Sequence, residues 1–146
     1  MLKILGRRKN IGQAQMRPSE TQEPDLATRR ARWVSLLARA EPAELDNALK
    51  SLEEAPGYDL LRPPECGLVM VRGRAGGTGA PFNLGEMTMT RCAVALNSGG
   101  TGFGYVAGRA QRHAELAALF DALLQEPVRR EGLERDLIAP IENRLN

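Results

Sequence analysis

One histidine and two cysteines are the side chains of this sequence best suited to act as bases, nucleophiles or metal ligands. His113 has neither a serine nor a cysteine beside it in the sequence, so spacing alone gives no nucleophile–base pair. It precedes Leu116 and Phe120 at helical spacing, which places it next to an apolar stripe. Two interpretations follow: a structural histidine, which this alignment favours, and a candidate catalytic residue that contacts a substrate.

The two cysteines lack the pattern of a metal site. Cys66 and Cys92 lie far apart in the sequence, without CxxC spacing and without a histidine near either of them. Structural zinc sites need four nitrogen or sulfur ligands, usually at short, recurring spacings. We therefore expect no metal in this chain and interpret the cysteines as reduced, buried thiols of a cytoplasmic protein.

Four arginines lie close in sequence to glycine-rich segments: Arg72, Arg74, Arg91 and Arg109. A guanidinium group binds phosphate or carboxylate in a bidentate fork, and glycines leave backbone N–H groups uncovered beside it. On that interpretation Arg74, Arg91 and Arg109 are candidate substrate- or phosphate-binding residues. Arginines at strand ends also extend into solvent without binding an anion, so both interpretations stay open.

The segment GFGYVAG resembles a phosphate-binding loop at first sight. Its glycines, Gly102, Gly104 and Gly108, are spaced one residue wider than the dinucleotide fingerprint G-x-G-x-x-G. Phe103 and Tyr105 alternate with the first two glycines, and this period of two predicts a strand. A strand face without side chains is typical of close approach by another backbone. We expect the three glycines to pack against another element or another subunit.

Apolar residues at helical spacing predict the elements that position these residues. Helices are predicted at about 25–40, 43–54 and 110–125, and a weaker helical pattern from 133 to 145 is interrupted by Pro140.

Strands are predicted between the second and third helices, at 58–62, 67–74, 86–97 and 101–109. Pro63 and Pro64 separate the first two, and the apolar face of the third changes sides near Arg91, where we expect a β-bulge. This order of segregated helices and strands predicts an α+β fold. We expect an antiparallel β-meander of about four strands, flanked by N-terminal and C-terminal helix pairs.

Length and charge limit the classes of protein to which this chain can belong. The 146 residues suit one domain, which we place at 21–146, after a basic N-terminal extension at 1–20 that we expect to be disordered rather than a polyanion-binding arm. A formal net charge of +2 does not suggest a dedicated nucleic-acid-binding protein. The sequence also shows neither a secretory signal nor an apolar stretch long enough for a membrane span, so we expect no membrane partner.

Several blocks of the sequence together resemble the PhnG family, the small G subunit of the carbon–phosphorus lyase system. The most specific are R-x-G-G-T-G at 74–79 and G-R-x-x-x-H-A-E at 108–115. The stretches RRARWVSLLARAEPAEL and LIAPIE also contribute, and the resemblance runs from about Thr28 to Glu142. It covers nearly all of the predicted domain.

This resemblance implies a cytoplasmic accessory subunit of phosphonate catabolism. Its partners would be the H, I and J subunits, in a core complex with two copies of each subunit. The first reaction of that complex displaces adenine from ATP and joins an alkylphosphonate to ribose C1, which gives α-D-ribose 1-methylphosphonate 5-triphosphate from methylphosphonate. ATP is then a substrate of the complex, an iron–sulfur cluster belongs to J, and this chain needs no cofactor. In the alternative role, the arginines and His113 form part of the active site.

The sequence departs from the family at the start of the third helix. The family block usually reads G-R-D, and Ala110 stands where the Asp would be. An Asp there would cap the helix, so its absence costs about 1 kcal/mol unless another group caps it. The chain also ends at Asn146, soon after LIAPIE, where family members often continue.

Overall fold

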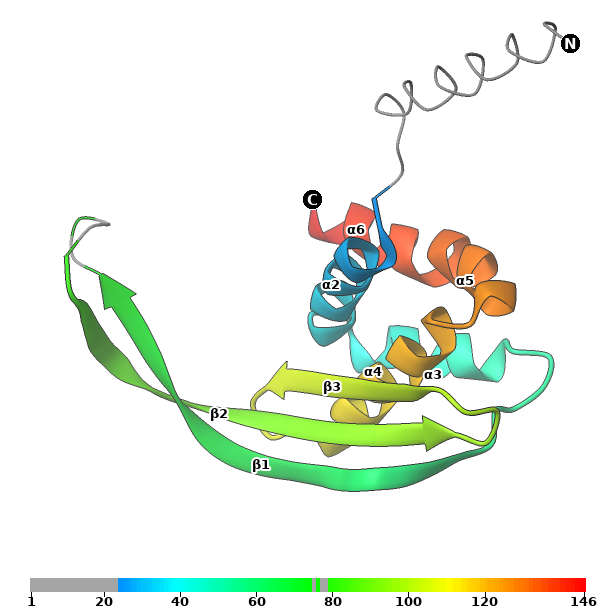
Figure 1. Ribbon diagram of the computed structural model, residues 1–146, viewed down its shortest axis with the longest axis horizontal. Coiled ribbons are helices and arrows are strands. Elements are labelled where there is room, and N and C mark those ends of the chain that lie inside the picture. Colours follow the sequence, from blue (N-terminus) through cyan, green and yellow to red (C-terminus); the bar gives the residue numbers. More distant parts are fainter. Residues whose placement is uncertain (1–23, 75, 77–78) are drawn as a thin grey trace, which may run out of the picture.

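A computed structural model describes residues 24–74, 76 and 79–146, and it places a group of helices at one end of a three-stranded sheet (Figure 1). The elements in order are α2 (Leu26–Ala38), α3 (Pro42–Lys50), β1 (Tyr58–Arg74), β2 (Pro81–Leu96), β3 (Thr101–Ala107), α4 (Gln111–Leu124), α5 (Pro127–Leu133), the π-helical segment η2 (Glu134–Ile138) and α6 (Ala139–Leu145). The α+β class is confirmed, as is an antiparallel sheet with helices before and after it in the sequence. The predicted N-terminal extension, 1–20, lies outside the described residues.

The sheet has the strand order β1-β2-β3, and its first strand unites two of the predicted ones. Pro63 and Pro64 are accommodated inside β1 because β1 is an edge strand and its register against β2 shifts between Arg62 and Glu65. This register shift lies opposite Arg91, so the β-bulge expected near that residue is on the neighbouring strand, β1, and not on β2. The register of β2 against β3 is regular from Met89 to Ala95, so the side chains of β2 keep their alternation there.

Helix α4 forms the centre of the core. Its buried side chains meet the sheet face that carries Cys92, Val94 and Val106, and they also meet apolar residues of α2, α3 and the C-terminal helices. The third helix was predicted from its leucine-rich stripe, and 11 of its residues are buried. Because nearly the whole circumference of α4 is covered, it is an internal helix rather than a surface one.

The C-terminal helices form one continuous helical run in which Pro140 does not end the helix. Pro140 lies in the first turn of α6, directly after the π-helical segment η2. A proline ring normally clashes with the carbonyl four residues earlier, and the wider π-helical turn makes room for it.

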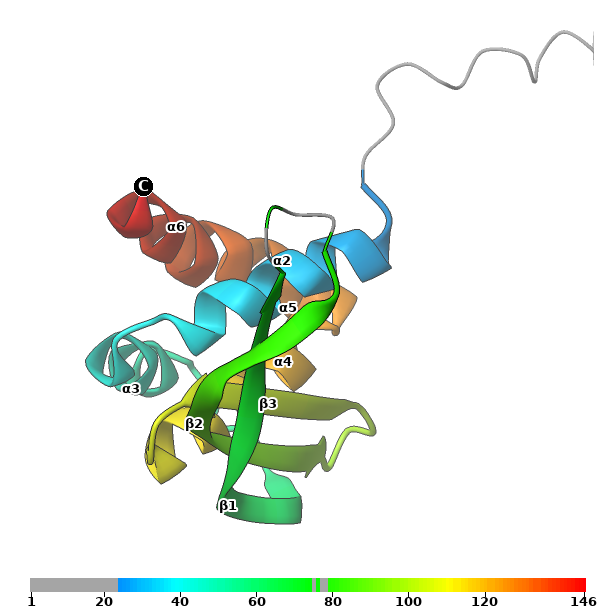
Figure 2. The same ribbon diagram turned by 90° about the vertical axis from the view of Figure 1, so that its left-hand side faces the viewer.

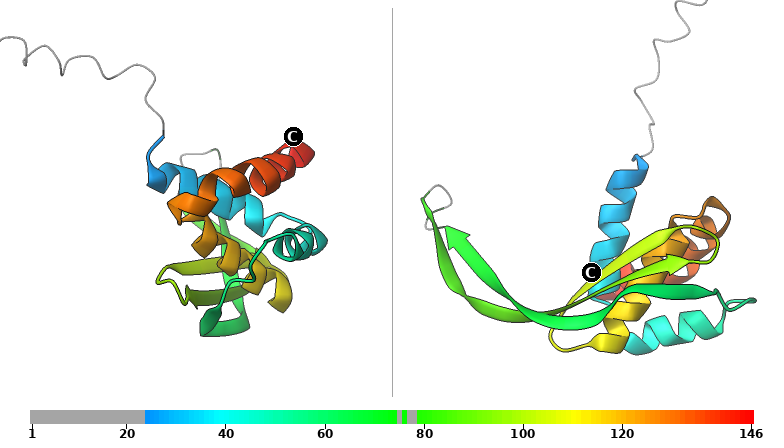
Figure 3. Two further views of the ribbon diagram at one scale, coloured as in Figure 1. Left: turned by 90° about the vertical axis from the view of Figure 1, so that its right-hand side faces the viewer. Right: turned by 60° about the horizontal axis from the view of Figure 1, so that its bottom comes forward.

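Part of the β1–β2 hairpin extends beyond the rest of the molecule. β3 pairs with β2 only between Met89 and Ala95, whereas β1 and β2 continue together to Arg74 and Pro81. We call residues 67–74 and 81–88 the arm; at about 3.3 Å per residue it is about 25 Å long. Seen from its free end, the arm is a twisted two-stranded ribbon in front of the helices (Figure 2), and a further view shows it extending away from them (Figure 3). Every described residue of the arm is exposed or half-buried.

Candidate functional site

His113 lies between two helices. Its side chain is buried, and its Nε2 is 2.9 Å from the carbonyl oxygen of Leu37, near the C-terminal end of α2. Because a carbonyl only accepts hydrogen bonds, Nε2 carries the proton and donates it. The contact joins the first turn of α4 to the last turn of α2, where carbonyl groups lack partners within their own helix. The structure thus gives the one histidine a role in helix packing.

A buried carboxylate that the sequence analysis missed connects α2, α4 and β3. Asp121 is fully buried and accepts hydrogen bonds from Arg30, whose Nη2 lies 2.7 Å away, and from Trp33 Nε1 at 2.9 Å. It also accepts one from the backbone N–H of Phe103, at 2.9 Å. An acidic residue between Phe120 and leucines of the apolar stripe is the signal that could have revealed it. Its bonds fix the three elements relative to one another.

Thr90 connects the end of β3 to the start of α4. Its Oγ1 donates to the carbonyl of Gly108 at 2.6 Å and accepts from the backbone N–H of Ala110 at 3.0 Å. Gly108 has a φ of +86°, a conformation that favours glycine, so its place is in the turn between these elements. Ala110 is the N-cap residue of α4 and forms no side-chain capping bond. Thr90 thus provides an acceptor for one backbone N–H group at the start of α4.

Gly102 and Gly104 form the bare strand face, and this face lies against α4 of the same chain. A Cβ added to Gly104 would collide with the carbonyl oxygen of Ala114 and lie 2.9 Å from the nitrogen of Ala118. One added to Gly102 would collide with the carbonyl oxygen of Ala118 in the same way. The element that packs closely on these two glycines is therefore α4, not a second subunit.

The candidate anion-binding arginines are distributed along the molecule. Arg91 is paired with Glu65 through Nη2 and Oε1 at 2.9 Å, and this neighbour holds the pKa of the Glu65 carboxyl below its usual value. Arg74 donates to the carbonyl of Gly79 at 3.0 Å, at the free end of the arm. Arg74 lies nine residues beyond Glu65 on β1, a separation of about 30 Å. Arg72 is exposed on the arm and Arg109 just after β3, so the described residues do not bring the four guanidinium groups into one site.

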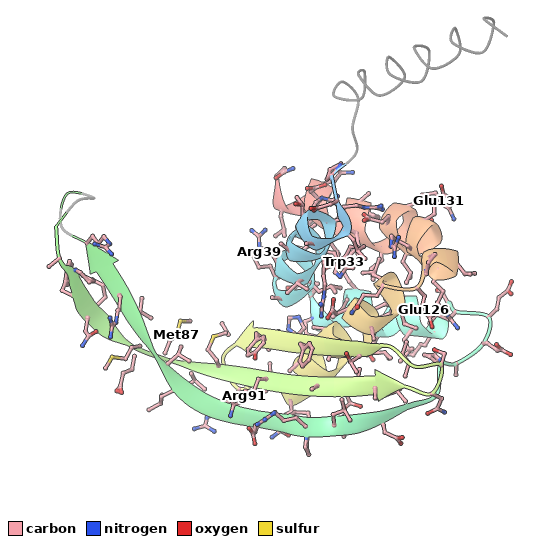
Figure 4. The ribbon with its side chains drawn as sticks, viewed as in Figure 1. Trp33, Arg39, Met87, Arg91, Glu126 and Glu131 are labelled. Carbon is pink, nitrogen blue, oxygen red and sulfur yellow. The ribbon has the colours of Figure 1, made fainter. Side chains whose placement is uncertain are left out.

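The sheet face opposite α4 carries a continuous set of apolar side chains. Residues paired directly across antiparallel strands point to the same side, so the register assigns this face. We call it the apolar arm face; its members are Val69, Val71, Phe82, Leu84, Met87, Met89, Tyr105 and Phe103. Figure 4 shows Met87 on the arm and Arg91 where β2 passes between its two neighbours. The alternation of Val69 and Val71 with Leu68 and Met70 is typical of a strand, but a local pattern of this kind does not reveal that both strands leave the body of the protein.

A hollow of about 280 Å³ lies at the base of the apolar arm face, where the arm meets β3. Its lining includes Val69, Met89 and Tyr105, with the Arg91–Glu65 pair at the same place. Gly67 leaves its floor bare, because a Cβ added there would meet nothing within 4 Å. The volume is slightly below the ~300–1,000 Å³ typical of small-molecule sites, and it suits a single large side chain.

A larger and more open cavity, of about 690 Å³, lies beside α2 and α5. Its cationic side chains already have partners within the chain. Arg32 bonds to Glu134 and Glu142, and Arg130 donates to the carbonyls of Leu124 and Gln125 at the end of α4. Among the residues that the structure describes, no group of three or more His, Cys, Asp and Glu residues is placed to hold a metal ion, and no helix is long and apolar enough to cross a membrane.

Comparison with known proteins identifies the family of this chain. The profile of the family described as "Phosphonate metabolism protein PhnG" matches residues 28–146. A protein of Rhizobium meliloti (strain 1021), named "Alpha-D-ribose 1-methylphosphonate 5-triphosphate synthase subunit PhnG", is 42% identical over 119 residues, which cover 82% of this chain and 76% of the relative. Both matches include the glycine face, His113 and the arm described above. The chain belongs to the PhnG family.

Proposed function

We propose that this chain is an accessory subunit of the cytoplasmic carbon–phosphorus lyase core complex, which works with the H, I and J subunits. The complex would transfer ribose triphosphate from ATP to an alkylphosphonate in phosphonate catabolism. Family membership and the relative's name, a subunit of a synthase, support this role. The observation that carries it is the apolar arm face, a large exposed surface in a chain whose buried polar groups, His113 and Asp121, are occupied by helix packing.

The proposed reaction needs groups that this chain uses for other purposes. A phosphonate oxygen forms a bond to ribose C1 while the bond from C1 to adenine breaks, and adenine takes up a proton as it leaves. A general acid and a triphosphate-binding site must therefore be present in the complex. We assign them to partner subunits, the nucleosidase chemistry to I, and give this chain the role of holding the assembly together.

The test measures turnover in purified complexes with and without this chain. Adenine release is followed by chromatography, and ribose methylphosphonate triphosphate by phosphorus NMR. We expect the H, I and J subunits purified without this chain to lack turnover and the addition of the chain to restore it. A complex that reacts at the full rate without this chain would contradict the proposed function.

Two variants distinguish this role from the alternative, in which this chain supplies active-site groups. For His113→Gln we expect activity per assembled complex within a few-fold of wild type, together with a lower unfolding temperature. A catalytic His113 would instead lower turnover by about 10²–10⁴-fold without loss of assembly. For Arg91→Ala we expect unchanged ATP affinity, whereas a phosphate-binding arginine would weaken it by about 1.5–3 kcal/mol.

A further inference from the structure

We propose that the outer edge of β3 pairs with the same edge of a second copy of this chain, so that two sheets join into one across a two-fold axis. This pairing goes beyond the proposed function, and its tests use the chain alone. Three features of the edge support it: free backbone groups at its centre, the absence of charge and proline along it, and a groove beside it.

The register between β2 and β3 determines which backbone groups of β3 point outward. The N–H of Gly108 donates to the carbonyl of Thr88 at 2.7 Å, and from there every second residue of β3 bonds to β2. The residues between them turn their N–H and C=O groups away from β2. These residues are Phe103, Tyr105 and Ala107.

Part of this outer edge is already occupied, and part of it is free. The N–H of Phe103 donates to Asp121 at 2.9 Å, and the carbonyl of Thr101 accepts from Gln125 at 2.7 Å. Within the described part of the chain, the N–H and C=O groups of Tyr105 have no such partner, and the residue is 52% exposed. An unpaired edge is a template for another strand, so the centre of the pairing lies at Tyr105.

The two edges of the sheet differ in what a second strand would meet. β3 contains neither a charged residue nor a proline from Thr101 to Ala107. Charges, prolines and irregular register are the devices by which proteins keep an edge strand from pairing. β1, the other edge, has register shifts and carries both kinds of residue: Asp59, Arg62, Pro63, Pro64, Glu65, Arg72 and Arg74. The edge that a second copy can offer is therefore β3 again, and pairing of β3 with β3 closes after two chains.

A groove beside β3 leaves room for the added strand. Its volume is about 410 Å³, and it lies between Tyr105 and the small side chains of Ala27 and Ala31 on α2. On the two-fold axis the Tyr105 residues of both copies exchange their N–H···O=C bonds, and the N–H of each Ala107 donates to the carbonyl of Phe103 in the other copy. The two Tyr105 rings then lie opposite each other, an aromatic pair of the kind that stabilises sheets. A second copy thus complements the edge in backbone groups, charge and shape.

Sedimentation velocity of the purified chain at increasing concentration measures the pairing. We expect an equilibrium between monomer and dimer, with no larger species. The Tyr105→Pro variant loses the outward N–H but keeps the bonds between β3 and β2, because Tyr105 donates none of them. We expect this variant to raise the dimer dissociation constant at least tenfold. The matched control, Tyr105→Phe, keeps the N–H and the ring, and its dissociation constant should stay within twofold of wild type.

A further variant tests whether the apolar arm face joins the two copies instead. Val69→Asp with Met87→Asp places two charges on that face and leaves the edge of β3 unchanged. Its dimer dissociation constant should stay within twofold of wild type. Circular dichroism of each variant verifies the fold. Loss of the dimer in this variant, with its fold intact, would overturn the proposal, because the arms would then hold the copies together.

Disulfide formation tests the two-fold register without removing a backbone bond. Residues that exchange both of their backbone bonds have Cα atoms about 5.5 Å apart, within the range that a disulfide spans. In the Tyr105→Cys variant, copper phenanthroline should therefore oxidise two thiols to a disulfide, and mass spectrometry should locate it between position 105 of both copies. The control is Val128→Cys on α5, because Val128 is 93% exposed and distant in sequence from β3. It should give no such dimer.

Several results would overturn the pairing and leave the proposed function standing, because turnover of the assembled complex is measured separately. One is a chain that stays monomeric at every concentration, and another is a series of oligomers that grows beyond the dimer. Dimerisation of a folded Tyr105→Pro variant at wild-type strength would do the same. If Tyr105→Pro does not fold, the cross-link decides: a Tyr105→Cys variant that cross-links no faster than Val128→Cys would show that the edges of β3 do not meet.

Discussion

At the scale of single residues, Asp121 has the most consequential set of contacts in the described chain. Removing its carboxylate leaves the guanidinium of Arg30, the indole N–H of Trp33 and the N–H of Phe103 without their acceptor. We expect Asp121→Ala to lower the free energy of unfolding by about 1–3 kcal/mol or more, because it leaves buried N–H donors without an acceptor. Urea unfolding measures this change.

The matched control for Asp121 is Asp136, an exposed carboxylate that pairs with the adjacent Arg135. Exposed ion pairs contribute little because water screens the charges, so Asp136→Ala should leave the urea midpoint unchanged within error. If both variants lost the same free energy of unfolding, burial of Asp121 would not explain its contribution to stability.

Tyr58 gives a prediction on pH. Its hydroxyl donates to Glu115 Oε2 at 2.6 Å, and burial, followed by this bond to a carboxylate, raises the pKa of Tyr58 from 10.0 to about 12. The folded state therefore favours the neutral phenol. Its contribution to stability is complete below about pH 10 and is lost as the pH rises through about 12.

The measurement for Tyr58 uses the Tyr105→Phe variant, in which Tyr58 is the one remaining tyrosine. Titration of the tyrosinate absorbance in the folded protein should have its midpoint near 12. Tyr58→Phe should reduce the loss of stability between pH 10 and 12, and the buried thiol of Cys92, whose pKa burial raises to about 11, accounts for part of the remaining loss. A midpoint near 10 would show that Glu115 does not hold the hydroxyl in solution.

At the scale of elements, the sequence predicts the helices and strands that the local spacing of apolar residues determines. The leucine stripes gave the helices, and the alternation of Phe103 and Tyr105 with glycines gave β3, because both patterns are local consequences of burial. The union of two predicted strands across Pro63 and Pro64 was missed, because edge position is a property of the whole sheet. For the same reason, the pattern could not reveal that Arg74 and Arg91 lie far apart or that Asp121 has three donors around it.

The contact between β3 and α4 gives a prediction on stability. Gly104→Ala places a Cβ against the carbonyl oxygen of Ala114, which belongs to the backbone of a buried helix and cannot move aside easily. We expect it to lower the free energy of unfolding by about 1–3 kcal/mol or more, as overpacking does. Gly67→Ala is the control in the same sheet, because its Cβ meets nothing within 4 Å. Denaturant unfolding of the isolated chain compares the two, and an unchanged midpoint for Gly104→Ala would contradict the packing described here.

The start of α4 offers a stabilising change. Ala110→Asp supplies a side-chain acceptor for the N–H groups of the first turn, so we expect a gain of about 1 kcal/mol in the free energy of unfolding. Gln111→Asp is the control that separates capping from charge, since it places the same charge at the first helical position without capping geometry. A gain as large for Gln111→Asp would assign the effect to the helix dipole.

At the scale of the whole molecule, folding and assembly use different surfaces. The core lies between α4, the helices around it and the part of the sheet that β3 covers. The arm contributes none of its described residues to that core, and its apolar side chains stay in contact with water. Stability of the chain and its association with a partner should therefore respond to different substitutions.

Shortening the arm tests this division directly. Leu68 and Thr88 are paired across the hairpin, and Thr88 also accepts a bond from the N–H of Gly108, so both are retained while residues 69–87 are replaced by Asn-Gly, a two-residue hairpin turn. We expect the shortened chain to unfold cooperatively, with nearly the same midpoint and denaturant slope, because the slope follows the surface exposed on unfolding and the arm is already largely exposed. Capture by affinity-tagged H, I and J subunits on co-expression should fall at least tenfold. A shortened chain without cooperative unfolding would show that the arm stabilises the helical end of the molecule, and the separation of folding from assembly would then be wrong.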